Sequence, residues 1–272
     1  MKQILPVLAA LALAGCAATT QLADPREIAV EADVAPAGAV LSPNMKGLVS
    51  QTGPSYVTVI VHEARPPGGR AMDTLPDALT SGSGFVVDSA GHVVTAAHVA
   101  LRQGADVEAR GADGRIYNGR VITVRPENDM ALIKLSGFKG TPVTPANNTC
   151  MRKGEPIFSL GKPHAQGDIA RIGEVESMTF GRAVNYNGYG YPDAMVLKMS
   201  TKKGESGGPV FNSSGELTGM VVSTLSDGNG RPLNLAHAIP TAALAGFVCA
   251  NTSCSPRWQA LRTQAPARCG GA

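Results

Sequence analysis

The sequence predicts an all-β protein in which short strands form two consecutive groups. From Val57 onward, β-type runs of a few residues alternate with turns rich in Gly, Asn, Asp and Ser. The runs fall into a set before residue 140 and a set after residue 150, and no glycine-rich nucleotide loop opens a helix after a strand. These observations favour paired barrels or paired sandwiches over a βαβ sheet, and the hydrophobic pattern alone leaves both open.

Composition excludes several function classes. The chain has 272 residues, of which 43% are hydrophobic and 17% charged, so it can bury a sizeable core in one large domain or two small ones. The net charge of +3 is small and evenly spread, which argues against a nucleic-acid partner or a polybasic membrane patch. Only 4% of the residues are aromatic, which argues against an aromatic-lined platform for carbohydrate or nucleic acid.

Each group of strands can be followed along the chain. The first group has three strand and turn patterns and then a compact buried strand, at residues 56–64, 84–99, 106–124 and 130–135. The second group has five strand patterns followed by the only strongly helical run, at residues 156–161, 170–180, 194–200, 208–222, 234–240 and 241–249.

The first residues form a targeting segment rather than part of the fold. In "MKQILPVLAALALAGC" an apolar run follows one Lys and is far shorter than the roughly 20 residues that span a bilayer. We therefore expect residues 1–15 to be a signal peptide. The ending before Cys16 resembles the lipobox of bacterial lipoproteins, in which this cysteine is lipidated; the alternative is a plain secretory signal with a chance cysteine. The residue after this cysteine is Ala17, as in lipoproteins that are sorted to the outer membrane, where they face the periplasm.

Residues 16–53 are expected to be the lipidated Cys16 and a flexible tether. The segment from 17 to 53 has no Phe, Tyr or Trp and is rich in Ala, Pro and small polar residues. The folded domain is expected over 54–250, with its first group of strands at about 54–140 and its second group at about 150–248. Residues 251–272 are expected to be a tail.

Four further cysteines suit an oxidising compartment, where they can form disulfides. Four cysteines allow three pairings, which the sequence leaves open. We favour Cys249 with Cys254, which closes a short loop, and Cys150 with Cys269, which would tie the tail to the domain. Zinc is the competing idea, but neither a second close Cys pair nor a His pair at ligand spacing accompanies them, so we expect no metal and no other cofactor.

Three local patterns carry the chemistry. His98 follows an apolar strand in "TAAHV", Asp129 enters another in "NDMALIKL", and Ser206 lies in the glycine turn "GESGGP". A serine hydroxyl becomes a good nucleophile when an imidazole takes its proton, and a carboxylate holds that imidazole in the right tautomer. Glu127, the nearest rival carboxylate to Asp129, follows a proline in a loop and is expected to be a surface charge.

These motifs resemble the trypsin-like serine peptidases, specifically the protease domain of the HtrA (Deg) group. The resemblance rests on "SGSGFVVDSAGHVVTAAHV", "NDMALIKL", "GEPIFSLGKP", "GESGGPVFNSSGELTGMVV" and "AHAIP", in this order, and runs from about residue 54 to 248. It implies two six-stranded Greek-key β-barrels with a short C-terminal helix. It also implies that His98 is the general base, Asp129 orients it, Ser206 is the nucleophile, and the amides of Gly204 and Ser206 form the oxyanion hole.

The sequence departs from the group in three ways. We expect no PDZ domain, because few residues remain after Pro240. Residues 17–53 do not resemble the N-terminal segment through which HtrA proteins usually trimerise, so the oligomeric state stays open. Glu205 stands where the group commonly has Asn, and its side chain is expected to point away from the cleft.

The resemblance also suggests the substrate pocket. Ser200 and Thr201 take the floor positions, so no Asp is present to pair with Arg or Lys, and glutamate-specific relatives have a His where this chain has Val221 and Val222. This predicts a neutral pocket for small or medium apolar side chains, into which His237 could intrude; the alternative is that His237 is an ordinary strand residue.

The sequence thus predicts a serine endopeptidase that cleaves peptide bonds in envelope proteins and is lipid-anchored to the outer membrane. The alternatives are a catalytically silent binding or chaperone-like module on the same fold, and hydrolysis of esters at the same site. The expected partners are a protein or peptide substrate and a membrane, without nucleic acid.

Overall fold

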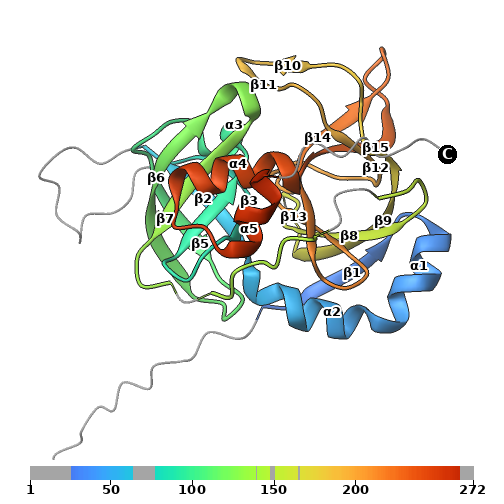
Figure 1. Cartoon of the computed structure of the whole chain (residues 1–272), viewed down its shortest axis with the longest axis horizontal. Coiled ribbons are helices and arrows are strands. Elements are labelled where there is room, and N and C mark those ends of the chain that lie inside the picture. The colour runs from blue at the N-terminus through green and yellow to red at the C-terminus, as the bar shows by residue number, and fades with distance from the viewer. Residues whose placement is uncertain (1–25, 64–76, 139, 148–150, 165, 264–272) are drawn as a thin grey trace, which may run out of the picture.

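The computed structural model describes residues 26–63, 77–138, 140–147, 151–164 and 166–263. Two β-barrels stand side by side in Figure 1, the N-terminal one in green and cyan and the C-terminal one largely in orange and yellow. The predicted all-β double barrel with a C-terminal helix is therefore confirmed.

The N-terminal barrel is a closed ring of six strands in the order β2-β3-β4-β7-β6-β5. Its strands are β2 (Tyr56–His62), β3 (Ala78–Val86), β4 (His92–Thr95), β5 (Asp106–Arg110), β6 (Ile116–Arg125) and β7 (Met130–Leu135). The short helix α3 (Ala97–Ala100) follows β4, and the 3₁₀ turn η3 (Pro126–Asn128) joins β6 to β7. Neighbouring strands are antiparallel throughout, and their buried side chains, most of them Val, Leu, Ile or Ala, fill the ring.

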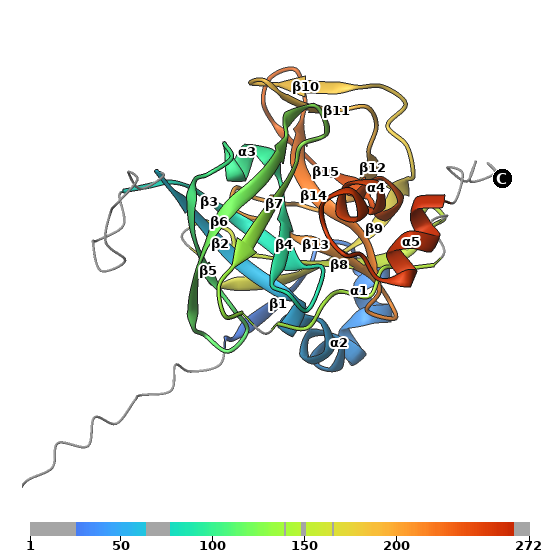
Figure 2. The same ribbon diagram turned by 60° about the vertical axis from the view of Figure 1, so that its left-hand side comes forward.

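The C-terminal barrel closes because β8 pairs with both β9 and β13. Its strands are β8 (Pro156–Gly161), β9 (Asp168–Ser177), β12 (Met195–Lys198), β13 (Pro209–Asn212), β14 (Leu217–Ser226) and β15 (Pro232–Pro240). A separate hairpin of β10 (Val184–Tyr186) and β11 (Tyr189–Tyr191) leaves this barrel between β9 and β12. In Figure 2 the hairpin reaches across toward α3 and the β6–β7 connection, and β11 contacts η3.

Residues 26–53 are part of the fold, so the prediction of a flexible tether is wrong for this part of 16–53. Strand β1 (Ile28–Ala32) pairs in parallel with Asp168–Ile172 of β9, on the same edge as β12. Helix α1 (Ala35–Leu41) contacts β8 and β9, and the 3₁₀ turn η1 (Ser42–Asn44) leads into α2 (Met45–Thr52) and η2 (Gly53–Ser55). The segment is ordered by aliphatic side chains, without any aromatic ring; Val34, Ala37, Leu41, Met45 and Leu48 are all buried.

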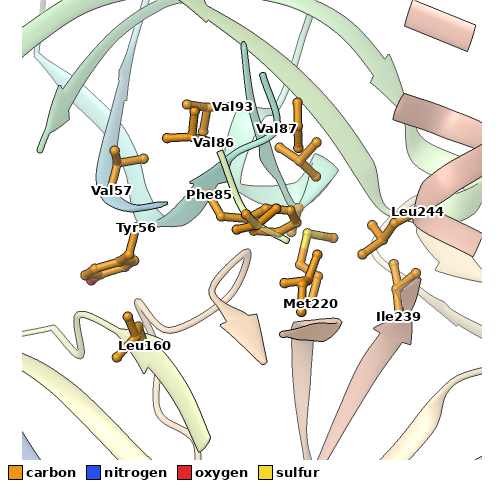
Figure 3. Close-up of a cluster of buried hydrophobic side chains, with 14 of the residues drawn as sticks. Tyr56, Val57, Phe85, Val86, Val87, Val93, Leu160, Met220, Ile239 and Leu244 are labelled. Atoms are coloured by element: carbon orange, nitrogen blue, oxygen red, sulfur yellow. The ribbon is translucent and has the colours of Figure 1, made fainter. Parts of the chain in front are cut away.

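The core runs continuously between the barrels. Figure 3 shows Phe85 of β3 in the same cluster as Leu160 of β8, Met220 of β14 and Ile239 of β15. Helix α4 (Thr241–Asn251) contacts β14, β15 and β7, and adds Leu244 to this cluster. The two barrels are thereby packed into one unit. This packing fixes the positions of the elements that each barrel contributes to the junction between them.

The folded part of the chain continues beyond α4, because part of the expected tail 251–272 is helical. Helix α5 (Pro256–Thr263) packs against α4 through buried Trp258 and Leu261. Cys249 and Cys254 are joined in a disulfide at the turn between the helices, as the shorter of the two favoured pairings predicts. Cys150 and Cys269 lie outside the described residues, as do Cys16 and residues 1–15, for which a signal peptide is predicted. No helix in the described part of the chain is long and apolar enough to cross a membrane.

The structural role of the N-terminal segment can be tested at neighbouring positions. Leu41 is 2% exposed and Val40 is 57% exposed. We expect Leu41→Ala to lower the free energy of unfolding by about 2–5 kcal/mol, because it removes buried methyl groups and leaves a cavity. Val40→Ala should change it by about 0.5 kcal/mol or less. Equal, negligible effects of both substitutions in urea unfolding would show that the segment is a tether after all.

Candidate active site

His98 and Asp129 come from the same end of the N-terminal barrel. His98 lies in α3 directly after β4, and Asp129 lies between η3 and β7. Strands β4 and β7 are paired, with Thr95 opposite Ala131, so the residues just beyond these positions are brought together. The pairing of two strands thus places an imidazole beside a carboxylate, although 31 residues of chain separate them.

Asp129 holds the imidazole of His98 in one orientation. Its Oδ2 and Oδ1 lie 2.9 and 3.1 Å from Nδ1 of His98, and Oδ1 also accepts the backbone N–H of His98 at 3.0 Å. Asp129 is fully buried and adopts a left-handed backbone conformation with φ of 48°. Because a carboxylate accepts and does not donate, Nδ1 carries the proton and Nε2 is left as the acceptor.

Ser206 lies in a tight turn that precedes β13 in the C-terminal barrel. Gly204 and Gly207 have positive φ angles of 97° and 82°, which residues with a Cβ rarely adopt. A Cβ on Gly207 would lie 2.2 Å from the carbonyl oxygen of Ser83, so the turn comes closer to β3 than any other residue type would allow. Gly207 is therefore required by the approach of one barrel to the other, whereas a Cβ on Gly204 would lie 2.3 Å from the carbonyl oxygen of Lys162.

The turn is bonded to the N-terminal barrel through Ser83. The amide of Ser83 donates to the carbonyl of Ser206 at 2.9 Å, and its Oγ donates to the carbonyl of Gly204 at 2.8 Å. A Cβ on Gly82 would meet the Val99 side chain at 2.7 Å and the Ser206 carbonyl at 3.0 Å, so α3 and the turn meet at this glycine. Ser206 is thereby held next to the helix that carries His98.

Two amides of the turn have no hydrogen-bond acceptor in the part of the chain that the structure describes. Within the described residues the hydrogen bonds of the turn use the amides of Glu205, Gly207 and Gly208, but not those of Gly204 and Ser206. The hydroxyl of Ser206 is directed to the carbonyl of Val222, 3.5 Å away, rather than to His98. Among the described residues, no hydrogen bond joins Oγ of Ser206 to Nε2 of His98.

Tyr186 is a site residue that the sequence reasoning missed. Its hydroxyl donates to Oδ2 of Asp129 and lies 3.1 Å from Nδ1 of His98. Burial first, and then the charge and hydrogen bond of Asp129, raise the pKa of Tyr186 far above its ordinary value, so the hydroxyl keeps its proton. The turn of the β10–β11 hairpin is Asn187-Gly188, a strong hairpin signal that could have located this element in the sequence.

Comparison with known proteins agrees with this geometry. The sequence profile of the trypsin-like peptidase domain matches residues 82–220, just over half of the chain. The chain belongs to the trypsin-like peptidase family.

Several relatives of this peptidase are proteases of the Do, Deg and HtrA type. It is 29% identical over 212 residues to the chloroplastic Protease Do-like 5 of Arabidopsis thaliana, covering 71% of this chain and 64% of that protein. It is 27% identical over 257 residues to a probable periplasmic DegP-like serine endoprotease of Ectopseudomonas mendocina, covering 88% and 52%. The chain spans about half to two-thirds of the length of these two relatives.

Solved structures of similar fold include Deg5, with 25% identity, a TM-score of 0.57 and coverage of 75% of this chain and 92% of that one. Another is the HtrA-type protease AlgW with a tripeptide, with 22% identity, a TM-score of 0.62 and coverage of 75% and 62%. The fold of this trypsin-like peptidase is therefore shared with proteases of the HtrA type.

The predicted pocket residues of this peptidase are only partly brought together. Thr201 is buried and bonded through its hydroxyl to Thr224 of β14 at 2.9 Å, and His237 is paired with the adjacent residue Ser223. Ser200 is tied elsewhere: its amide donates to Oδ2 of Asp33 at 2.7 Å, and its hydroxyl donates to Asn234 at 3.1 Å.

His237 is a buried residue of β15. Its Nδ1 lies 2.8 Å from the Tyr191 hydroxyl, and its ring centroid lies 4.3 Å from that of Phe180. Nε2 has no hydrogen-bond partner among the described residues. Burial lowers the pKa of His237, so the neutral imidazole is favoured.

The remaining predictions concern charge and metal. Glu127 is exposed on η3, as expected for a surface charge. Among the described residues, no group of three or more His, Cys, Asp or Glu side chains is arranged to hold a metal ion.

Proposed function

We propose that this trypsin-like peptidase is a serine endopeptidase that cleaves proteins of the bacterial envelope through His98, Asp129 and Ser206. The observation that carries the proposal is the contact of the His98 ring with buried Asp129, next to a serine turn that is bonded to the same barrel. An imidazole fixed in this tautomer presents Nε2 as the base that a serine nucleophile requires.

The reaction begins when Oγ of Ser206 rotates away from the Val222 carbonyl and attacks the carbonyl carbon of the peptide bond. Nε2 of His98 takes the hydroxyl proton, and the positive charge that develops on the ring is stabilised by Asp129. The protonated His98 then gives this proton to the leaving amine, and an acyl ester on Ser206 remains. A water molecule, deprotonated by His98, hydrolyses the ester and restores the hydroxyl.

The amides of Gly204 and Ser206 are proposed to bind the oxyanion formed in each half of the reaction. They are the two amides of the turn that make no hydrogen bond with the described residues, and positive φ at Gly204 shapes the turn around them. Removing one oxyanion donor typically costs about 2.7–4 kcal/mol in the barrier to turnover. These donors act on an atom whose charge appears only during the reaction, so they lower the barrier without tightening substrate binding.

The proposed substrate pocket is neutral. Thr201 and His237 both contact the stretch of β14 that follows the nucleophile strand, and burial disfavours a charged imidazole. Such a pocket suits small or medium apolar side chains before the scissile bond. The DegP-like relatives are periplasmic endoproteases by description, which supports an envelope protein as substrate.

One observation favours the alternative of a silent binding module on the same fold. The hydroxyl of Ser206 is directed to the carbonyl of Val222 instead of to His98. Covalent labelling of Ser206 decides between the two functions.

For that test we expect a fluorophosphonate probe to label the wild-type protein and to fail on Ser206→Ala, because only an activated hydroxyl attacks the phosphorus. His98→Ala should lose nearly all labelling, because the base is removed. Gel fluorescence with circular dichroism as a control for folding makes the measurement. Absence of Ser206-dependent label on folded wild-type protein would reject the enzyme and leave the binding module.

Tyr186→Phe should lower kcat by about tenfold or more, because a hydrogen bond to a charged acceptor contributes about 1.5–3 kcal/mol. Tyr189→Phe is the matched control: this ring also lies beside His98, with centroids 6.2 Å apart, but its hydroxyl makes no hydrogen bond within the described chain. Steady-state cleavage of an ester or peptide substrate measures both. Equal rates for the two variants would remove Tyr186 from the site.

We also propose that Cys16 anchors the peptidase by a lipid to the outer membrane, on the ground of its lipobox context. Cys16→Ser should move the protein from the membrane pellet to the soluble periplasmic fraction, since the acyl chains supply the membrane affinity. Fractionation of cells expressing each form measures this. Continued pelleting of the variant, with an unrelated periplasmic protein recovered in the soluble fraction, would argue against the anchor.

A further inference from the structure

A buried ion pair lies directly under the serine turn and takes no part in the proposed reaction. The side chains of Arg171 and Glu205 are each 2% exposed, and Nη2 of Arg171 lies 2.8 Å from Oε1 of Glu205. Nε of Arg171 donates to the same oxygen at 3.2 Å, so the guanidinium meets the carboxylate with two of its nitrogens. Glu205 stands between the two residues whose amides are proposed to bind the oxyanion.

The Glu205 side chain also closes the turn on itself. Its Oε2 accepts the amide of Lys202 at 2.9 Å, and the amide of Glu205 donates back to the carbonyl of Lys202 at 3.1 Å. A Cβ on Gly161 of β8 would lie 2.9 Å from Cγ of Glu205, so the glycine leaves room for this carboxylate side chain. The side chain is thus fixed by its charge partner, by the turn and by the neighbouring strand.

The other end of the guanidinium is held by the N-terminal segment. Nη1 of Arg171 lies 2.9 Å from Oε2 of Glu31 and 3.3 Å from Oδ1 of Asp33. Burial alone would lower the pKa of Arg171, but the hydrogen bond and charge of Glu205, with Asp33 and Glu31, outweigh it and raise the pKa. The second oxygen of Asp33 accepts the amide of Ser200, so the segment bonds directly to the loop before Ser206 and is also linked to Glu205 through Arg171.

We propose that Arg171 and Glu205 are positioning residues for the oxyanion turn. Glu31 of β1 and Asp33, which follows β1, then make the N-terminal segment part of the same site. The proposal rests on the function proposed above. A series of contacts links this segment to the turn. Glu31 and Asp33 contact Arg171 on β9, Arg171 contacts Glu205, and Glu205 lies between Gly204 and Ser206, whose amides face the oxyanion. Loss of any link frees the turn to move its amides away from the oxyanion, which slows turnover and leaves substrate affinity nearly unchanged.

Arg26 gives a matched control. It pairs with Asp168 at 3.2 Å, and both side chains are as buried as those of Arg171 and Glu205. This pair also joins the N-terminal segment to β9 but does not touch the serine turn. We expect Arg171→Met to lower kcat by about 100-fold with KM changed by less than about threefold, and Arg26→Met to keep kcat within about threefold of wild type. Equal losses of kcat in both variants would overturn the proposal.

Two further variants separate positioning from folding. In the double variant Arg171→Met, Glu205→Leu an apolar pair replaces the ion pair, which often restores stability. We expect its melting temperature to recover while kcat stays low; recovery of both would overturn the proposal. If Arg171→Met does not fold, the double variant Glu31→Gln, Asp33→Asn decides, because Glu31 is 42% exposed at the rim of the network. A loss of kcat of about three- to tenfold supports the proposal and unchanged kcat overturns it.

The same assay separates this inference from the proposed function. A folded wild-type protein that shows no Ser206-dependent labelling or turnover contradicts the enzyme itself, and with it this inference. An active wild type whose Arg171 variant matches the Arg26 variant contradicts only the positioning role.

Discussion

The amide of Ser83 donates to the carbonyl of Ser206, and the site depends on this contact between the two barrels. The N-terminal barrel supplies the imidazole and the carboxylate, and the C-terminal barrel supplies the serine. Neither barrel holds a complete site, so the distance between them must be fixed. Gly207 allows the approach, since any Cβ there would collide with Ser83, and the shared core around Phe85 and Met220 keeps the barrels from separating. Packing far from the site therefore sets its geometry.

The second constraint on the site is electrostatic and comes from the N-terminal segment, residues 26–53. Arg171 is almost completely buried, and a buried guanidinium is stable only when carboxylates surround it. Two of its partners, Glu31 and Asp33, come from the segment that precedes both barrels, and the third, Glu205, comes from the serine turn. The segment that places β1 against β9 is thereby linked through Arg171 to Glu205, the residue before Ser206. Stability of the N-terminal segment and geometry of the turn are coupled through one side chain.

Sequence reasoning found what local pattern determines. Strand β7 coincides with the predicted run 130–135, the ring of His98 contacts Asp129, and Ser206 lies in a turn that precedes β13. Prediction from the sequence failed where tertiary contacts, rather than a local pattern, order a segment. Residues 26–53 lack aromatic rings, but small aliphatic side chains suffice because β8 and β9 provide a surface for them. Tyr186 and Arg171 are distant in sequence from the residues they bond, so no local pattern could assign their partners.

The proposed reaction requires the amides of Gly204 and Ser206 to face the charge that develops when Ser206 attacks a carbonyl. A crystal structure of the protein phosphonylated on Ser206 tests it most directly, because the phosphonyl oxygen occupies the place of the oxyanion. We predict that this oxygen lies within roughly 2.7–3.1 Å of both amide nitrogens, with Nε2 of His98 in hydrogen-bond reach of Oγ. A phosphonyl oxygen that faces solvent, with either amide turned away from it, would contradict the proposed oxyanion site.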